Sequence, residues 1–271
     1  MMATLFDNIL QGVIADVAAR EEVVPFKEIK RLSRNVPPAR DVLSVLQKPG
    51  CCVIAEIKRA DPVTNHVNAV ADPAELARLC EQSGACIIGC QTESRRFNGN
   101  LEDVRTVKEA VGAPVWCKTF IVDPYQVHEA RYYGADLVAL QVAALEHDRL
   151  VALLDRVHSL GMEAIVEVVS EEEADRGVQA GARIIGVDAR DMRSSTIDKE
   201  RFSLIAPGLP TSVVKVALSG VSSPVDLMRY AGAGADAVVV GEALSRSSEP
   251  DRLCRSLVAA GMHPALSLIH I

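Results

Sequence analysis

The sequence predicts an α/β fold, a (β/α)8 barrel in which eight parallel strands alternate with helices. Four stretches, at 83–90, 133–140, 180–187 and 233–240, share one order: the end of a helix, a glycine, a small residue and a continuous apolar strand. A glycine at that point can end a helix in the left-handed conformation. Strands that are apolar throughout are typical of a parallel sheet that is covered on both faces.

Further apolar runs lie between these four stretches, each after a helical stretch, so that a strand and helix unit recurs along the chain. Counting the runs predicts eight strands, which start at Cys52, Cys86, Val115, Leu137, Ala164, Ile184, Val213 and Ala237. Eight such units make a (β/α)8 (TIM) barrel. An open doubly wound sheet is the alternative, and it is disfavoured because no Gly-x-Gly-x-x-Gly turn follows the first strand.

The composition fits one such barrel over residues 1–265, because 49% of the 271 residues are apolar and only 4% are aromatic. The net charge of −7 and the lack of a Lys/Arg cluster argue against nucleic-acid and membrane-surface partners. The seven cysteines show no Cys-x-x-Cys spacing, so we expect reduced cysteines in a cytoplasmic protein. We expect neither a signal peptide nor a membrane span, which needs ~18 consecutive apolar residues.

Residues 1–48 are expected to form a helical extension of the barrel. Apolar residues recur at helical spacing over residues 5–20, and shorter helices are expected over 26–32 and 41–46. The extension has too few apolar residues to hold a core of its own, so we expect it to pack onto the barrel. Residues 266–271 look unlike the end of such a barrel, and they are interpreted as a tail that is not native to the fold.

Polar and charged residues follow the apolar strands at the end where barrel enzymes carry their active sites. Glu56 and Lys58 stand two apart at the end of the first strand, so their side chains are expected on one face. Alone, such a pair would be interpreted as a surface ion pair. Other strand ends repeat the arrangement, with Arg59, Thr92, Glu93, Phe97, Lys118, Gln141, Glu167, Asp188, Arg190, Ser219, Gly220, Gly241 and Glu242.

Lys118 is distinctive among these residues because it directly follows the apolar run from Val115 to Cys117. An ammonium group in such surroundings is costly to desolvate unless it is paired. We therefore expect Lys118 to form an acid/base set with Glu56 or Glu167, in which each group shifts the pKa of the other.

The motifs at these strand ends resemble those of the indole-3-glycerol phosphate synthase family, (β/α)8 enzymes of tryptophan biosynthesis. The resemblance runs from about Leu5 to Ala260 and covers all eight strand ends. It is carried by Val53-Ile-Ala-Glu-Ile-Lys-Arg59, Thr92-Glu-x-x-x-Phe97-Asn-Gly99, Lys118-x-Phe-Ile-x-Asp-x-Tyr-Gln126, Glu129-Ala-Arg131, Gly134-Ala-Asp136, Glu167, Gly186-Val-x-x-Arg-Asp191, Ser219-Gly220 and Gly241-Glu-x-Leu244.

The resemblance implies a carboxy-lyase that needs no cofactor. The substrate would be 1-(2-carboxyphenylamino)-1-deoxyribulose 5-phosphate, whose ring closure with loss of carbon dioxide and water gives indole-3-glycerol phosphate. Lys58 would hold the substrate carboxylate, Lys118 would act as general acid on the ketone oxygen, and Glu167 would accept a proton in the dehydration. An ammonium aimed at the oxygen where charge develops is a strong form of electrostatic catalysis.

Supporting roles are expected from the residues around these three. Glu56 would orient the lysines and balance their charge, and Phe97 would pack on the aromatic ring or merely anchor its loop. The other substrate contacts are expected from Arg59, Asp188, Arg190, Ser219, Gly220, Gly241 and Glu242. The serine and the glycines among them would offer backbone donors to the phosphate, because glycine lets the chain approach closely.

Four residues depart from the family pattern: Asp61, Thr119, Asp188 and Leu218 stand where the family usually has Ser, Asp, Asn and Glu. A carboxylate at Asp61 within ~6 Å of the substrate phosphate would cost on the order of a few kcal/mol, unless it turns to solvent. Leu218 cannot accept a proton. We therefore expect kcat/KM on this substrate to be at least about a hundredfold below that of an ordinary family member.

Other functions stay open at this point. One is a diverged paralogue with an altered substrate in a specialised pathway. Another is a catalytically weakened protein that binds a ligand or another enzyme of a tryptophan-like pathway. An isomerase acting on the same type of aminodeoxyribulose sugar is disfavoured, because the Glu-Ile-Lys-Arg and Lys-x-Phe-Ile motifs are not expected there.

Overall fold

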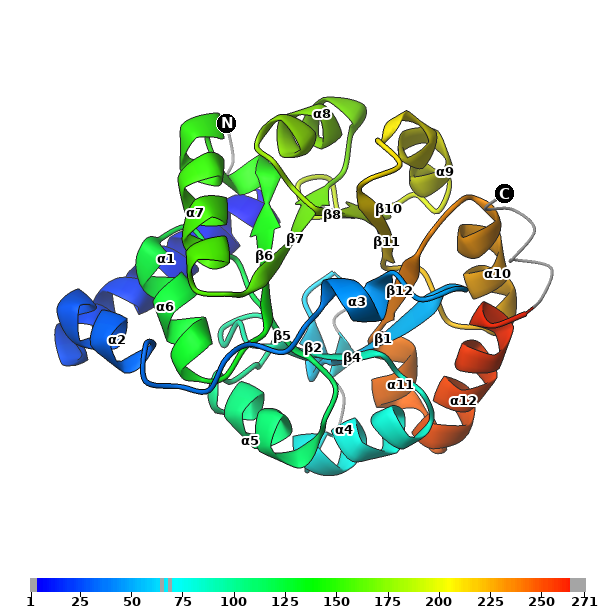
Figure 1. Cartoon of the computed structure of the whole chain (residues 1–271), viewed down its shortest axis with the longest axis horizontal. Helices are drawn as coiled ribbons and strands as arrows, with labels where there is room; N and C mark the ends of the chain where they lie inside the picture. The colour runs from blue at the N-terminus through cyan, green and yellow to red at the C-terminus, as the bar shows by residue number, and fades with distance from the viewer. Residues whose placement is uncertain (1–3, 64–65, 68–69, 264–271) are drawn as a thin grey trace.

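The computed structural model describes residues 4–63, 66–67 and 70–263. Its centre is a closed barrel of parallel strands with helices around it (Figure 1). In spatial order, the strands are β1 (Cys52–Ile57), β12 (Ala237–Val240), β11 (Val214–Leu218), β8 (Ile184–Asp188), β7 (Glu163–Val168), β6 (Leu137–Gln141), β5 (Val115–Lys118) and β4 (Ile87–Gln91). The predicted (β/α)8 fold is confirmed, and every barrel strand begins within one residue of its predicted start.

Helices cover the outside of the barrel between successive strands (Figure 1). They are α4 (Pro73–Gln82), α5 (Glu102–Ala110), α6 (Pro124–Tyr132), α7 (His147–Ser159), α8 (Glu171–Gln179), α9 (Arg201–Ile205), α10 (Pro224–Gly232), α11 (Glu242–Arg246) and α12 (Pro250–Gly261). Asp72, Ser170 and Ser223 cap the first turns of α4, α8 and α10 with their side-chain oxygens. The glycines of the four repeated stretches have φ between +89° and +100°, the left-handed helix ends that the sequence predicts.

Shorter elements connect the strands to the helices. They are the 3-10 helices η1 (Val142–Ala144) and η2 (Ala206–Gly208), and two antiparallel pairs: β2 (Ala60–Asp61) with β3 (His66–Val67), and β9 (Arg190–Asp191) with β10 (Thr196–Ile197). Both pairs follow the carboxyl end of a barrel strand, β1 and β8 respectively. They therefore position side chains at the mouth where the strands end.

The expected N-terminal extension is observed as α1 (Leu5–Val23), α2 (Phe26–Leu32) and α3 (Leu43–Leu46). The apolar face of α1 packs through Phe6 and Ile9 in one cluster with Phe97 and Phe120 of the barrel loops. A bidentate ion pair, with Arg20 Nε 2.7 Å from Glu129 Oε1, joins α1 to α6. The extension thus contributes to the walls around the carboxyl ends of the strands.

The last helix of the extension, α3, lies across the barrel in Figure 1. Leu46 packs with the side chains that fill the barrel interior, among them Ile54, Trp116 and Leu137. It therefore closes the amino-terminal end of the barrel. Among the described residues, no helix is both long enough and apolar enough to cross a membrane. The proposed tail, residues 266–271, lies outside the described residues.

Candidate active site

Two adjoining cavities lie at the carboxyl ends of the strands. The first, here the aromatic cavity, is lined by Phe6, Phe97 and Phe120 among others. The second, here the glycine cavity, has Gly220 and Gly241 in its wall. Four residues line both cavities: Lys58, Lys118, Arg190 and Ser219. The cations therefore stand at the junction between an apolar space and a space with exposed backbone.

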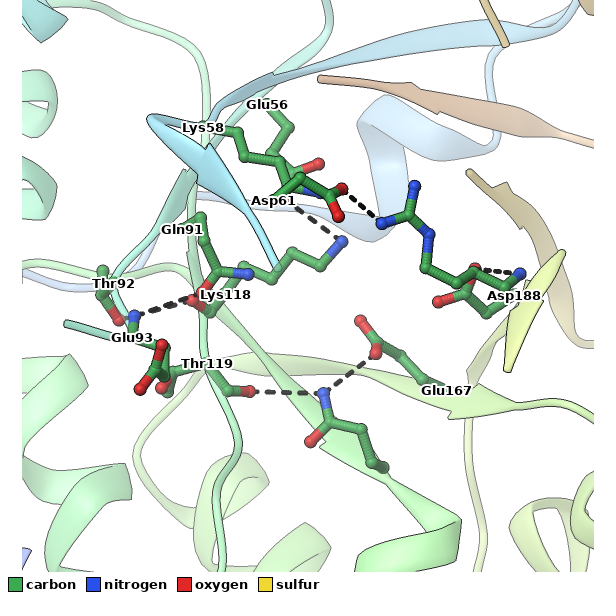
Figure 2. A network of polar contacts seen from close by, with 12 residues as sticks. Glu56, Lys58, Asp61, Gln91, Thr92, Glu93, Lys118, Thr119, Glu167 and Asp188 are labelled. Carbon is green, nitrogen blue, oxygen red and sulfur yellow. Dashed lines mark hydrogen bonds and ion pairs between the residues drawn. The ribbon is translucent and has the colours of Figure 1, made fainter. Parts of the chain in front are cut away.

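Lys118 ends β5 and reaches toward the centre of this mouth (Figure 2). Its Nζ lies 3.4 Å from Glu56 Oε1 and 4.9 Å from the centre of the Trp116 ring. Burial lowers the pKa of Lys118, but the negative charges of Glu56, Glu167 and Asp188 outweigh burial, and the pKa is raised. The ammonium form is therefore stable in this low-dielectric position and can serve as a proton donor.

Glu167 lies on β7, next to Gln141 of β6 in the strand register, and faces the same space as Lys118 (Figure 2). Gln141 Nε2 donates to Glu167 Oε2 at 2.9 Å, while Glu167 Oε1 has no hydrogen-bond partner among the described residues. Burial raises the pKa of Glu167 to about 7, although the charge of Lys118 lowers it. A carboxyl group with this pKa exchanges protons readily near neutral pH.

Asp61 is the unexpected member of the site. The residue is 2% exposed, and its Oδ2 accepts hydrogen bonds from Lys58 Nζ at 2.6 Å and from the Arg190 guanidinium. Burial raises the pKa of Asp61, but the charges and hydrogen bonds of Lys58 and Arg190 outweigh it and hold the pKa well below its usual range. The alternative that Asp61 turns to solvent is therefore wrong.

The expected backbone cradle lies in the glycine cavity. Ser219 and Gly220 have φ of +64° and +79°, which turns the chain sharply after β11. At Gly241, a Cβ atom would lie 2.5 Å from Glu56 Oε2, so a side chain there would displace the Glu56 carboxylate. Lys199 and Arg246 also line this cavity. Sequence reasoning missed these two cations, because neither stands at a strand end.

Of the other predicted site residues, Asp188 and Glu242 line the cavities and Arg59 does not. Asp188 lines the aromatic cavity, and its Oδ1 accepts the backbone N–H of Arg190 at 2.9 Å. Glu242 lines the glycine cavity and pairs with Arg246 at 3.1 Å. Arg59 is in the wall of neither cavity and instead forms a bidentate ion pair with Asp103 of α5. Thr92 and Glu93 also line neither cavity, so the structure brings together all the residues predicted to act on or contact the substrate except Arg59.

Leu218, at the end of β11, also departs from the expected site geometry. Its side chain is fully buried in the barrel interior, in one cluster with Ile165 and Ile184, and it lines neither cavity. A Cβ atom at Gly186 would lie 2.8 Å from Leu218 Cδ1, so the leucine fills the space beside that glycine. Leu218 therefore forms part of the floor beneath the mouth and supplies no polar group to it.

A buried carboxylate organises the loop that carries Phe97. Glu93 is 4% exposed and accepts the backbone N–H groups of Arg95, Arg96 and Phe97 at 3.1, 2.7 and 2.9 Å. This arrangement satisfies three donors that the turn would otherwise leave without partners. Glu93 therefore acts as a positioning residue for the aromatic cavity.

We predict that Glu93→Ala lowers the free energy of unfolding by about 2–4 kcal/mol, because one buried N–H group, that of Phe97, and two partly buried ones lose a charged acceptor. Urea unfolding followed by circular dichroism measures this change. The matched control is Glu102→Ala, which removes an exposed pair with Arg105 at 3.1 Å and is expected to cost less than about 1 kcal/mol. Equal losses in the two variants would contradict the role given to Glu93.

Among the described residues, no three His, Cys, Asp or Glu side chains are grouped so that they could hold a metal ion. The chemistry that the mouth itself offers is proton donation by Lys118 and proton uptake by Glu167, between a space that suits a flat apolar group and one that suits an anion.

Comparison with known proteins gives consistent matches. The sequence model of the family described as indole-3-glycerol phosphate synthase matches residues 6–257. The indole-3-glycerol phosphate synthase of Mycobacterium avium (strain 104) is 53% identical over 263 residues, which cover 97% of both chains. That of Mycobacteroides abscessus (strain ATCC 19977) is 54% identical over 262 residues, which cover 97% of this chain and 96% of the relative.

A solved structure supports the fold alone. The 3-hexulose-6-phosphate synthase from Salmonella typhimurium superimposes with a TM-score of 0.64 at 16% sequence identity, over 78% of this chain and all of that one. At this identity the likeness says nothing about the substrate.

Proposed function

The chain belongs to the indole-3-glycerol phosphate synthase family, and we propose that it closes the ring of 1-(2-carboxyphenylamino)-1-deoxyribulose 5-phosphate to give indole-3-glycerol phosphate. One observation carries the proposal: Lys118 is held beside Glu56, opposite Glu167, where the aromatic and glycine cavities meet. A substrate with an aromatic ring at one end and a phosphate at the other would place its ketone near this junction.

Each end of the substrate has a matching surface. The aryl ring would enter the aromatic cavity beside Phe97, whose ring centre lies 5.3 Å from Lys58 Nζ. The phosphate would enter the glycine cavity, where the turn at Ser219 and Gly220 brings the backbone close. Lys199 and Arg246, which pair with Asp226 and Glu242, are the cations in its wall. A phosphorylated small molecule is thus the class of substrate that both the family and the cavity chemistry support.

The proposed chemistry uses Lys118 first and Glu167 second. As the aryl carbon attacks the ketone carbon, Lys118 would donate its proton to the ketone oxygen, which becomes a hydroxyl group. Carbon dioxide then leaves the aryl carbon, and its bonding electrons remain in the ring. For the dehydration, Lys118 would first regain a proton from solvent and donate it to the hydroxyl group, which leaves as water, while Glu167 would accept the proton that the ring system loses. Glu56 would keep the ammonium aimed at the oxygen throughout.

The decisive experiment is the fluorescence of indole-3-glycerol phosphate, followed as purified protein acts on the substrate. Formation of the product at a rate above that of a Lys118→Met variant supports the proposal. Tight binding of the substrate without any product would instead favour the catalytically weakened binding protein. A cytoplasmic location is part of the proposal, supported by seven free cysteines. A partner among the enzymes of the same pathway is also proposed, and co-purification would test it.

We predict that kcat/KM is at least about a hundredfold below that of the Mycobacterium avium relative measured side by side, because Asp61 and Leu218 replace a neutral and an acidic group. The double change Asp61→Ser plus Leu218→Glu should recover part of the loss. Since Leu218 lies in the floor of the mouth, we expect Asp61→Ser to contribute more of that recovery. Steady-state kinetics of the two single variants and the double variant measures how much of the kcat/KM each change restores. A kcat/KM of the unmodified protein equal to that of the relative would contradict the prediction.

A further inference from the structure

Asp61 pairs with two of the cations of the mouth, Lys58 and Arg190. Lys58 follows β1, Asp61 lies on β2 and Arg190 on β9, so three separate segments meet at one carboxylate oxygen. The exposed fractions of the side chains are 1% for Asp61, 11% for Lys58 and 10% for Arg190. Lys58 and Arg190 line both cavities, whereas Asp61 lines neither. A ligand in the mouth would therefore meet the cations, with their counter-charge directly behind them.

This order of charges weakens the attraction of the cations for a ligand anion. A ligand carboxylate about 3 Å from Lys58 would lie roughly 6 Å from the Asp61 carboxylate, so repulsion offsets about half of that cation's attraction. The same oxygen also serves Arg190, which shares the counter-charge. Asp61 is ionised, because Lys58 and Arg190 keep its pKa well below the usual range. The offset is therefore present at every pH at which the enzyme would work.

We propose that Asp61 is a specificity-determining residue: it offsets the charge of Lys58 and Arg190, so that the carboxylate on the substrate's aromatic ring adds little to binding. The inference rests on the proposed function, because it concerns one group of that substrate. The mouth would accordingly bind phosphorylated N-aryl aminodeoxyribuloses with similar affinity whether or not the ring carries a carboxylate. The proximity of Lys58 to the Phe97 ring places the affected cation at the aryl end.

The experiment compares two unreactive ligands by titration calorimetry. Both are substrate analogues in which the ketone is reduced to an alcohol; one carries a 2-carboxyphenyl group and the other a phenyl group. For the unmodified protein we expect Kd values within about threefold of each other. For Asp61→Asn, which keeps the shape, and Asp61→Ser, we expect the carboxylated analogue to bind at least about tenfold tighter than the phenyl one, which corresponds to about 1.4 kcal/mol.

Asp191→Asn is the matched control, because Asp191 lines the aromatic cavity but pairs with Arg193, at 3.1 Å, and not with Lys58 or Arg190. It should keep the ratio of the unmodified protein. The inference would be overturned if the ratio of the two Kd values were unchanged in both Asp61 variants. It would also be overturned if the unmodified protein itself bound the carboxylated analogue more than about tenfold tighter, a result that does not depend on the folding of any variant. Failure of both analogues to bind any of the proteins would overturn the proposed function and the inference with it.

Discussion

Replacing Lys118 by methionine is expected to lower kcat by about 10³- to 10⁴-fold. The change removes both the proton donor and the positive charge aimed at the ketone oxygen, and each of these effects is worth orders of magnitude in enzymes. KM should change far less, because the aromatic cavity and the glycine cavity, which would bind the two ends of the substrate, keep their other lining residues. Single-turnover fluorescence of the product measures the loss of the chemical step directly.

The fold should survive this substitution. Methionine has nearly the length of lysine, and the carboxylates that Lys118 leaves behind can take up a proton instead of staying charged, so we expect a loss below about 2 kcal/mol. Lys108→Met is the matched control, because Lys108 pairs with the fully buried Asp136 at 2.6 Å, away from the mouth. That variant should lose stability and keep its kcat. If Lys118→Met retained most of its turnover, Lys118 would not be the general acid.

The strands and their functional ends could be predicted from the sequence because the signals are local. Continuous apolar runs and the glycines that end helices recur along the chain, and a polar residue that directly follows such a run must lie at the mouth. Lys118, Glu167 and Asp188 were found in this way. Arg59 was misjudged, although strand alternation was available as a signal: it is adjacent to Lys58 and so points to the opposite face, where Asp103 binds it.

Contacts between distant segments could not be predicted. Helical spacing predicted α1, but that spacing does not show that Phe6 lies in the wall of the aromatic cavity. Asp61 was expected to repel the substrate phosphate because of its position in the chain. In the structure it is drawn to Lys58 and Arg190, since the cost of burying a carboxylate is met by pairing it. The partner 129 residues away, Arg190, becomes visible only in the folded chain.

Replacing Glu167 by glutamine is expected to lower kcat by about 10²- to 10³-fold, because an amide cannot accept the proton of the dehydration. The pKa of Glu167 is about 7, and a proton acceptor must be ionised. The kcat of the unmodified protein should therefore rise with pH through about 7, and the residual activity of Glu167→Gln should lack this rise. Glu163→Gln is the control: Glu163 begins β7 at the far end and pairs with Arg183 at 2.8 Å.

As the pH rises through the pKa of Glu167, the free energy of unfolding should fall while kcat rises. Burial raises the pKa of Glu167 from 4.5 in the unfolded chain to about 7 in the folded one, so between these values the folded protein binds more protons and loses stability as the pH rises. Above pH 7 the full cost is up to about 3 kcal/mol. Glutamine removes this cost and can still accept the hydrogen bond from Gln141. Urea unfolding should therefore show Glu167→Gln equal to the unmodified protein near pH 4, below the unfolded pKa, and more stable at pH 8. A variant that loses stability at pH 8, or a Glu163→Gln variant that loses as much kcat, would contradict this account of Glu167.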